Sequence, residues 1–334
     1  MHLLAPIGIS LTPVFVFLGA LMFLDTYKLI RPKRVLIAIG YGGLAAGFCY
    51  FANGFLYQQL GWSQEAFTHY VSPFVEEFTK ALLIVFLMAR HKIGFSVDAA
   101  IAGFSVGAGF AAVENVYYLS QLGDVGLITW FVRGFGTAVM HGGTTALLGI
   151  LTMHASDRRE LPLWIAALIG LGAAYVFHSG FNHFPLRPVP MTLLQLAVLP
   201  TVVVIVFQRS EQYTQEWLGV GFDSDQELLA IIYDGRISES RIGAYLEELK
   251  AQFPGEVVVD MLCYLRLYIE LSMKAKGTLL MQQAGFKVAP DPTIRPKFEE
   301  LEYLKNSIGR LGLLALAPFI HTSSRDLWQI HFVK

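Results

Sequence analysis

The chain has 334 residues, of which 54% are hydrophobic and only 15% are charged, and its mean hydropathy is +0.51. This composition excludes an ordinary soluble domain and is typical of a polytopic membrane protein. The formal charge of −1 gives no basic excess, so we expect no nucleic-acid partner. The two cysteines exclude a disulfide framework and a cysteine-based metal site.

Long apolar runs recur along the first two thirds of the chain, each long enough to cross ~30 Å of hydrocarbon with about 20 helical residues. They lie at residues 5–24, 35–56, 70–89, 95–121, 127–153, 162–183 and 190–208. We therefore predict an all-α membrane bundle with about seven transmembrane helices. Counts of six or eight stay open, because boundaries read from a sequence shift by a few residues.

Basic residues concentrate in alternate loops. Those after the first, third, fifth and seventh runs are Lys28, Arg31, Lys33, Arg34, Arg90, Lys92, Arg158, Arg159 and Arg209. The intervening loops hold only Arg187. Positive charge favours the cytoplasmic side, so we predict that the N-terminus lies outside and that the loop after the first span is cytoplasmic.

The composition changes near residue 210. Charges become frequent, and apolar residues such as Ile242, Leu246 and Leu249 recur at helical spacing. We predict two domains: a membrane-embedded domain at 1–209 and a soluble, helical, cytoplasmic domain at 210–334.

Four of the predicted spans carry an ionisable residue with a second polar residue one turn away, on the same helix face. The pairs are Glu76 with Lys80, Glu114 with Tyr118, His141 with Thr145, and His178 with Asn182; Glu77 adjoins the first pair and Arg133 precedes the third by about two turns. Ionisable residues inside a membrane are costly, so by default they indicate a functional site. Because successive helices alternate in direction, Glu76, Glu77, Glu114 and His178 are all expected in the outer half of the bilayer, with His141 slightly deeper.

Two chemistries fit carboxylates that lie beside imidazoles. In one, Zn²⁺ is held by His and Glu ligands with one position open for water, and a remaining glutamate is the general base. In the other, no metal is present: a glutamate takes the water proton, while His178 and Asn182 donate to the oxyanion. Lys80 partly neutralises the carboxylate pair in either case.

Structural alternatives compete with these assignments. Glu114 can be a buried partner of Arg133, and His141 can be an interhelical hydrogen-bonding residue. Tyr118 fits an interfacial aromatic belt. At the level of the whole protein, the alternatives to an enzyme are a secondary transporter or proton-coupled channel and a non-catalytic membrane sensor.

Taken together, the motifs resemble those of the PrsW family of intramembrane proteases, which is distantly similar to the CAAX prenyl protease and bacteriocin-processing membrane peptidases. The matching segments are residues 76–80, 110–118, His141, and 178–182. The resemblance covers about residues 70 to 185 and implies a membrane peptidase of the bacterial cytoplasmic membrane. The implied substrate is a single-span membrane protein, such as an anti-sigma factor.

The resemblance also implies roles for single residues. Glu76 is the catalytic glutamate, with Glu77 as its neighbour and second base, and His178 and Asn182 bind the substrate carbonyl. The second motif of the wider group resembles Phe-x-x-x-His. At the same spacing after Phe110, this chain has Glu114 in place of the histidine. This departure keeps the metal question open and makes Glu114, His141 and His178 the expected zinc ligands.

Overall fold

The computed structural model describes residues 4–25, 30–121, 126–158, 161–183, 185–286, 288–289 and 291–320. The described residues form helices and connecting turns, with no strand among them, so the all-α prediction is confirmed for this part of the chain. Two of the basic residues used to predict orientation, Lys28 and Arg159, lie outside the described residues.

The chain divides into two compact units, Met1–Ser210 and Glu211–Lys334. The first unit contains α1 (Leu4–Leu24), α2 (Pro32–Leu60), α3 (Gln64–Ala66), η1 (Phe67–Val71), α4 (Ser72–Ala89), α5 (Ser96–Gln121), α6 (Leu127–Phe131), η2 (Val132–Ala138), α7 (Val139–Arg158) and α8 (Leu163–Asn182). The helix α9 (Pro188–Tyr233) begins in the first unit and ends in the second. The second unit also contains η3 (Arg236–Glu239), α10 (Arg241–Leu249), α11 (Gly255–Gln283) and α12 (Ile294–Leu316).

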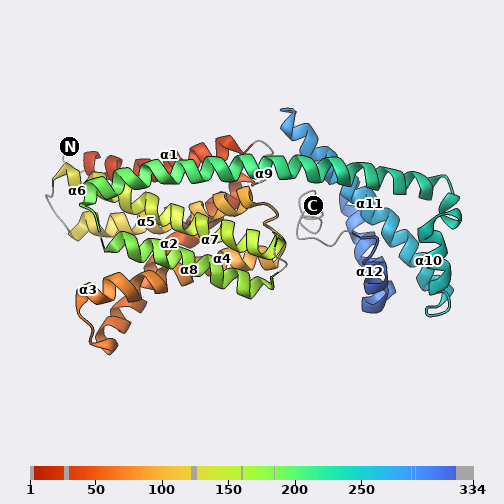
Figure 1. Ribbon diagram of the computed structural model, residues 1–334, viewed down its shortest axis with the longest axis horizontal. Helices are drawn as coiled ribbons and strands as arrows, with labels where there is room; N and C mark the ends of the chain where they lie inside the picture. Colours follow the sequence, from red (N-terminus) through yellow and green to blue (C-terminus); the bar gives the residue numbers. More distant parts are fainter. Residues whose placement is uncertain are drawn as a thin grey trace. The chain divides into compact units, whose positions relative to one another are not determined.

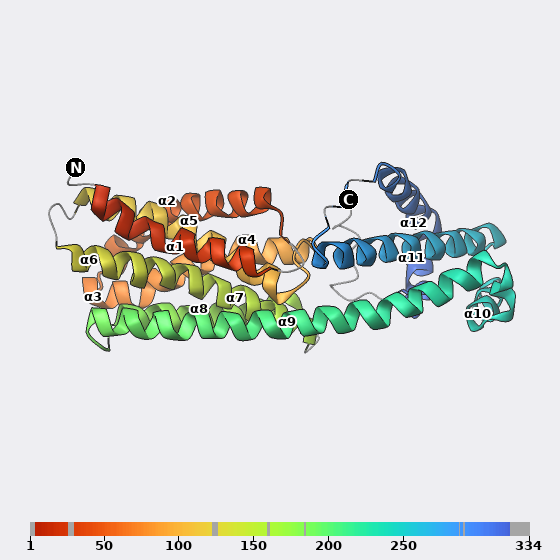
Figure 2. The same ribbon diagram turned by 90° about the horizontal axis from the view of Figure 1, so that it is seen from above.

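The long helices of the first unit run alongside one another as a bundle (Figures 1 and 2). In the described part of the chain, four segments are long and apolar enough to cross a membrane: α2, α5, α8 and Pro188–Glu216 of α9, while Gly8–Leu24 of α1 forms a shorter apolar helix. By contrast, α4 carries three charged residues, Glu76, Glu77 and Lys80, which the sequence singled out. Helix α7 has polar residues near both ends, at 141–145 and 154–158.

Helix α5 lies at the centre of the bundle, between α2, α7 and α1. Its glycines allow backbone-to-backbone packing, as small residues do in membrane helices. A Cβ atom on Gly107 would lie 2.1 Å from the carbonyl oxygen of His141, and one on Gly109 would lie 2.0 Å from that of Ile39. The glycines therefore fix how closely α7 and α2 approach α5.

Among the described residues of the bundle, two π-helical turns interrupt the helices. The first, η1, directly precedes α4, and the second, η2, directly precedes α7. A π turn adds a residue to the helical repeat and occurs often at functional sites. Both turns lie just N-terminal to helices that carry ionisable residues.

The second unit has its own apolar core. Buried residues of α11, such as Met261 and Leu265, pack with α12 residues such as Leu301 and Ile308, and Leu228 and Leu229 of α9 pack against them. The Asp225 carboxylate of α9 is buried and accepts hydrogen bonds from Ser272 and Lys276 of α11.

Candidate active site

The centre of the ionisable cluster is Glu77 on α4, whose side chain is fully buried. One oxygen, Oε1, accepts from Lys80 Nζ at 2.5 Å, from His178 Nδ1 at 2.7 Å and from Thr144 Oγ1 at 3.2 Å. Lys80 lies three residues later on the same helix and is also fully buried. Three donors on three helices therefore hold Oε1, and Lys80 supplies the opposite charge that a buried carboxylate requires.

These contacts settle which nitrogen of His178 carries a proton. Nδ1 faces the Glu77 carboxylate, so Nδ1 is the protonated nitrogen and donates to it. The lone pair of Nε2 then faces Glu76, with Glu76 Oε2 3.9 Å away. A carboxylate that fixes the tautomer of a histidine is the usual support of a metal ligand in proteins.

His141 on α7 lies between Lys80 and Glu114. Lys80 Nζ is 3.2 Å from Nδ1, and Glu114 Oε2 is 3.0 Å from Nε2. Because the ammonium can only donate, Nδ1 accepts and Nε2 is the atom on the Glu114 side. The ring also stacks edge-on against that of His178, with centroids 4.8 Å apart.

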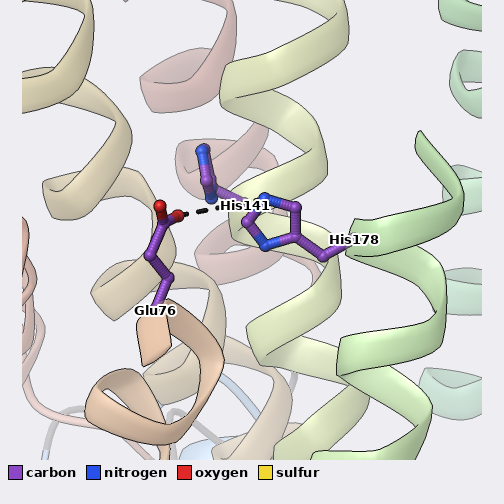
Figure 3. A group of neighbouring side chains, drawn as sticks. All are labelled: Glu76, His141 and His178. Atoms are coloured by element: carbon purple, nitrogen blue, oxygen red, sulfur yellow. Dashed lines mark ion pairs between the residues drawn. The ribbon is translucent and has the colours of Figure 1, made fainter. Parts of the chain in front are cut away.

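Glu76 points toward the two imidazole rings (Figure 3). Its side chain is 13% exposed, against 3% for His178 and 1% for His141. Its Oε1 atom accepts from Ser72 Oγ at 2.7 Å and from Asn53 Nδ2 of α2 at 3.4 Å. Helices α2, α4, α7 and α8 therefore each contribute a side chain around this carboxylate.

Glu76, His141 and His178 offer one ligand atom each, and these atoms lie within 4.8 Å of one another. One carboxylate and two imidazoles form a donor set that zinc peptidases use, and three protein ligands leave a position for water. The protonated Nδ1 of His178 leaves Nε2 free for a metal. By donor chemistry and by proximity, these residues fit a metal ion.

The sequence predicted Glu114, not Glu76, as the carboxylate ligand beside the two histidines. In the structure Glu114 contacts His141, as described, and its Oε2 also lies 3.4 Å from Arg133 Nη2. The Arg133 guanidinium lies over the Tyr118 ring at 3.7 Å. Glu114 thus pairs with Arg133, as the structural alternative expected, and it also lies beside the candidate metal-binding group. Its role as a metal ligand stays a prediction.

Asn182 lies at the end of α8, one turn beyond His178. Its amide nitrogen donates to the carbonyl oxygen of Thr68 in η1 at 3.0 Å, and Ser179 donates to the carbonyl of His69 at 2.7 Å. These bonds fasten α8 to the turn that leads into α4. The predicted role of Asn182 at the substrate carbonyl stays a prediction.

The sequence analysis missed three residues that contact the cluster: Asn53, Ser72 and Thr144. Ser72 precedes Glu76 by four residues and Thr144 follows His141 by three, so helical spacing could have found both. Asn53 is on a different helix, and no spacing in the sequence relates it to Glu76.

A scan against protein-family models matched residues 31–208, more than half of the chain, to the PrsW family of intramembrane metalloproteases. The chain belongs to this family. It is therefore a membrane-embedded peptidase, which sets aside the transporter and the non-catalytic sensor. Comparisons with curated proteins and with solved structures gave no match.

The PrsW match encloses every residue of the cluster, from Asn53 to His178, and ends before the second unit begins. The sequence-based resemblance is thereby confirmed at the level of the family. The family also makes the Glu76–His141–His178 group a candidate metal centre and implies a protein substrate.

Proposed function

We propose that this PrsW-family chain is a zinc-dependent intramembrane endopeptidase that cleaves a single-span membrane protein, such as one of the anti-sigma-factor type. The observation that carries the proposal is the approach of Glu76, His141 and His178 ligand atoms to within 4.8 Å of one another, from three helices.

The metal assignment follows from donor chemistry. One carboxylate and two imidazoles suit zinc better than magnesium or calcium, which prefer oxygen ligands. When bound, zinc lowers the pKa of a coordinated water and polarises the substrate carbonyl. Glu76, His141 and His178, the last through Nε2, are the residues that would hold it.

Glu77 and Lys80 act as positioning residues in this proposal. Glu77 holds the His178 ring through Nδ1, and Lys80 contacts both Glu77 and His141. Because Glu77 is fully buried and already accepts three hydrogen bonds, we assign it orientation of the ligands in place of the second-base role.

Glu114 is the remaining carboxylate beside the group. Its side chain is 25% exposed, more than that of any other carboxylate or imidazole described above, and it lies next to Nε2 of His141. We assign it the general-base role, in which it takes the water proton and returns it to the leaving amine. The Arg133 guanidinium, 3.4 Å away, balances the negative charge of this carboxylate.

The proposed topology has seven membrane crossings. They are α1, α2, η1 with α4, α5, α6–η2–α7, α8, and the first part of α9, with the N-terminus outside and residues 210–334 in the bacterial cytoplasm. Support comes from the match between these helices and the predicted spans and from the positive charge of alternate loops. A reporter enzyme that is active only in the cytoplasm should be active when it is fused after Ser210 and when it is fused at the C-terminus.

Glu76→Gln tests the function directly. In proteoliposomes that contain a tagged single-span substrate, the variant should lose cleavage by 100-fold or more, on the order of the loss of a catalytic group. Asp157→Asn, near the far end of α7, is the control and should cleave as the wild type does. Full cleavage by Glu76→Gln would refute the assignment.

A further inference from the structure

A short chain of hydrogen bonds leads from α2 to Glu76. Asn53 Nδ2 donates to Ser72 Oγ at 2.8 Å, and Ser72 Oγ donates to Glu76 Oε1 at 2.7 Å. The same Asn53 nitrogen lies 3.4 Å from Glu76 Oε1. Ser72 is the first residue of α4 and lies one turn before Glu76.

The number of available hydrogens fixes which group donates and which accepts in each of these hydrogen bonds. A serine hydroxyl has a single hydrogen, and Ser72 gives it to the carboxylate, which can only accept. Ser72 Oγ must therefore accept from the amide nitrogen of Asn53, and the second hydrogen of that nitrogen is directed to Glu76. With the Glu76 carboxylate ionised, the orientation of the Asn53 amide follows from these hydrogen bonds.

The register of α2 along α4 brings Asn53 to this place. Tyr41 donates to the carbonyl of Thr79 at 2.7 Å, and the Cys49 thiol contacts the carbonyl of Val75 at 3.9 Å. Asn53 continues this row by one more turn and reaches the side chains of Ser72 and Glu76. Side chains of α2 thus follow α4 across the level of the site.

Asn53 places a polar amide on a helix whose neighbouring side chains face lipid. Its neighbours Phe51 and Phe55 are 75% and 63% exposed, as expected for a helix that faces lipid. A polar side chain in such a helix is costly unless it is hydrogen-bonded, and it then commonly marks a functional region. Hydrogen bonds in this low-dielectric interior are also stronger than in water.

We propose that Asn53 and Ser72 are positioning residues for the Glu76 carboxylate. By holding Oε1, they leave Oε2 directed at His178 Nε2, where both atoms serve as ligands. This inference rests on the proposed function. It adds α2 to α4, α7 and α8 as a helix that shapes the metal centre. Removal of a residue that orients a metal ligand weakens metal affinity by roughly 10–100-fold.

Zinc affinity of the detergent-purified full chain, measured by competition with a chromophoric chelator, tests the inference without a substrate. Asn53→Leu and Ser72→Ala should each bind zinc roughly 10-fold or more weakly than the wild type. Ser72→Thr retains the hydroxyl and should recover most of the affinity. Ser120→Ala removes an exposed hydroxyl whose partners are the Tyr117 carbonyl and the Gln121 amide. It is the matched control and should bind zinc normally.

Thermal unfolding of the zinc-free proteins, measured in parallel, separates a local effect from misfolding. The inference requires a loss of affinity in variants that unfold like the wild type. Wild-type affinity in both Asn53→Leu and Ser72→Ala would overturn it, as would a loss in Ser72→Ala that Ser72→Thr does not recover. If Ser72→Ala does not fold, Asn53→Leu and Ser72→Thr decide.

Glu76→Gln separates this inference from the proposed function. If Glu76→Gln loses zinc while Asn53→Leu and Ser72→Ala keep it, only the positioning role is wrong. If Glu76→Gln keeps both zinc and cleavage, the metal centre itself is assigned wrongly.

Discussion

The Lys80 ammonium is fully buried and contacts an acid, a base and an aromatic ring. It pairs with Glu77, lies 3.2 Å from His141 Nδ1 and lies 4.7 Å from the Phe110 ring centroid. The sequence indicated only that Lys80 would neutralise the carboxylates on its own helix. Its contact with His141 connects α4 to α7.

Lys80→Met should strongly destabilise the first unit, because Glu77 would remain as a buried carboxylate without its cation. Removing one partner of a buried pair costs about 3–5 kcal/mol. The free energy of unfolding, measured by steric trapping in micelles, should fall by this amount. The double variant Lys80→Met/Glu77→Gln should recover part of it, and a loss below about 1 kcal/mol in the single variant would contradict this account.

Residue-level prediction succeeded where helical spacing carries the information. Glu76, Glu77 and Lys80 share a helix, and the polar residues of four spans do come together, as the expected depths indicated. Pairing across helices was harder, because rotation of each helix about its axis decides which carboxylate faces which imidazole. The sequence named Glu114 as a zinc ligand, and in the structure Glu114 contacts His141. The ligand atoms of Glu76, His141 and His178 also come together, which the sequence did not predict as a group.

At the level of helices, the glycines of α5 set the position of His141. Gly107 contacts the His141 carbonyl, and Gly103 contacts the Thr145 carbonyl one turn later. The partners of these two glycines are backbone atoms of α7. The π turns η1 and η2 were not predicted, since no composition signal distinguishes one from an α turn.

Gly107→Ala should push α7 away from α5, because the new Cβ would lie 2.1 Å from the His141 carbonyl oxygen. Overpacking of this kind costs about 1–3 kcal/mol, and we expect a loss of that size in unfolding free energy together with weaker zinc binding. Gly47→Ala on α2 has no heavy atom within 4 Å of its Cβ. This control should be neutral or slightly stabilising, and equal behaviour of the two variants would contradict the packing argument.

At the level of the whole molecule, the family match covers only the first unit, and residues 211–334 form a separate one. Apolar periodicity predicted that this part of the chain is helical, and its described residues do form helices. The sequence did not predict that α9 would continue through residue 210 to Tyr233 as one helix. A change in composition marks where the environment changes, while the helix itself ends only where backbone hydrogen bonding stops.

The second unit should lose stability in acid through Glu270, which accepts from Tyr233 and Lys297. Burial alone would raise the pKa of Glu270, but these hydrogen bonds outweigh it and lower the pKa below the ordinary value of 4.5. A carboxyl with a lowered pKa stabilises the fold above its unfolded-state pKa, and this contribution disappears as the pH falls through the folded-state value.

Glu270→Gln should therefore weaken the second unit at pH 7 by about 0.5 kcal/mol, a value reduced for solvent exposure. Hydrogen exchange of α11 and α12 peptides, compared with the wild type at the same pH, should be roughly two-fold faster at pH 7. The difference should shrink as the pH falls below 4.5. A difference independent of pH would contradict the assignment to the ionised carboxyl.

In the proposed function, Glu76, His141 and His178 hold a catalytic zinc ion. Elemental analysis of the detergent-purified chain tests it most directly, with His178→Ala measured beside His154→Ala, a control histidine exposed on α7. We predict about one zinc per chain in the wild type and in His154→Ala, and loss of zinc with cleavage in His178→Ala. Equal zinc content in all three proteins would show that His178 does not hold the metal.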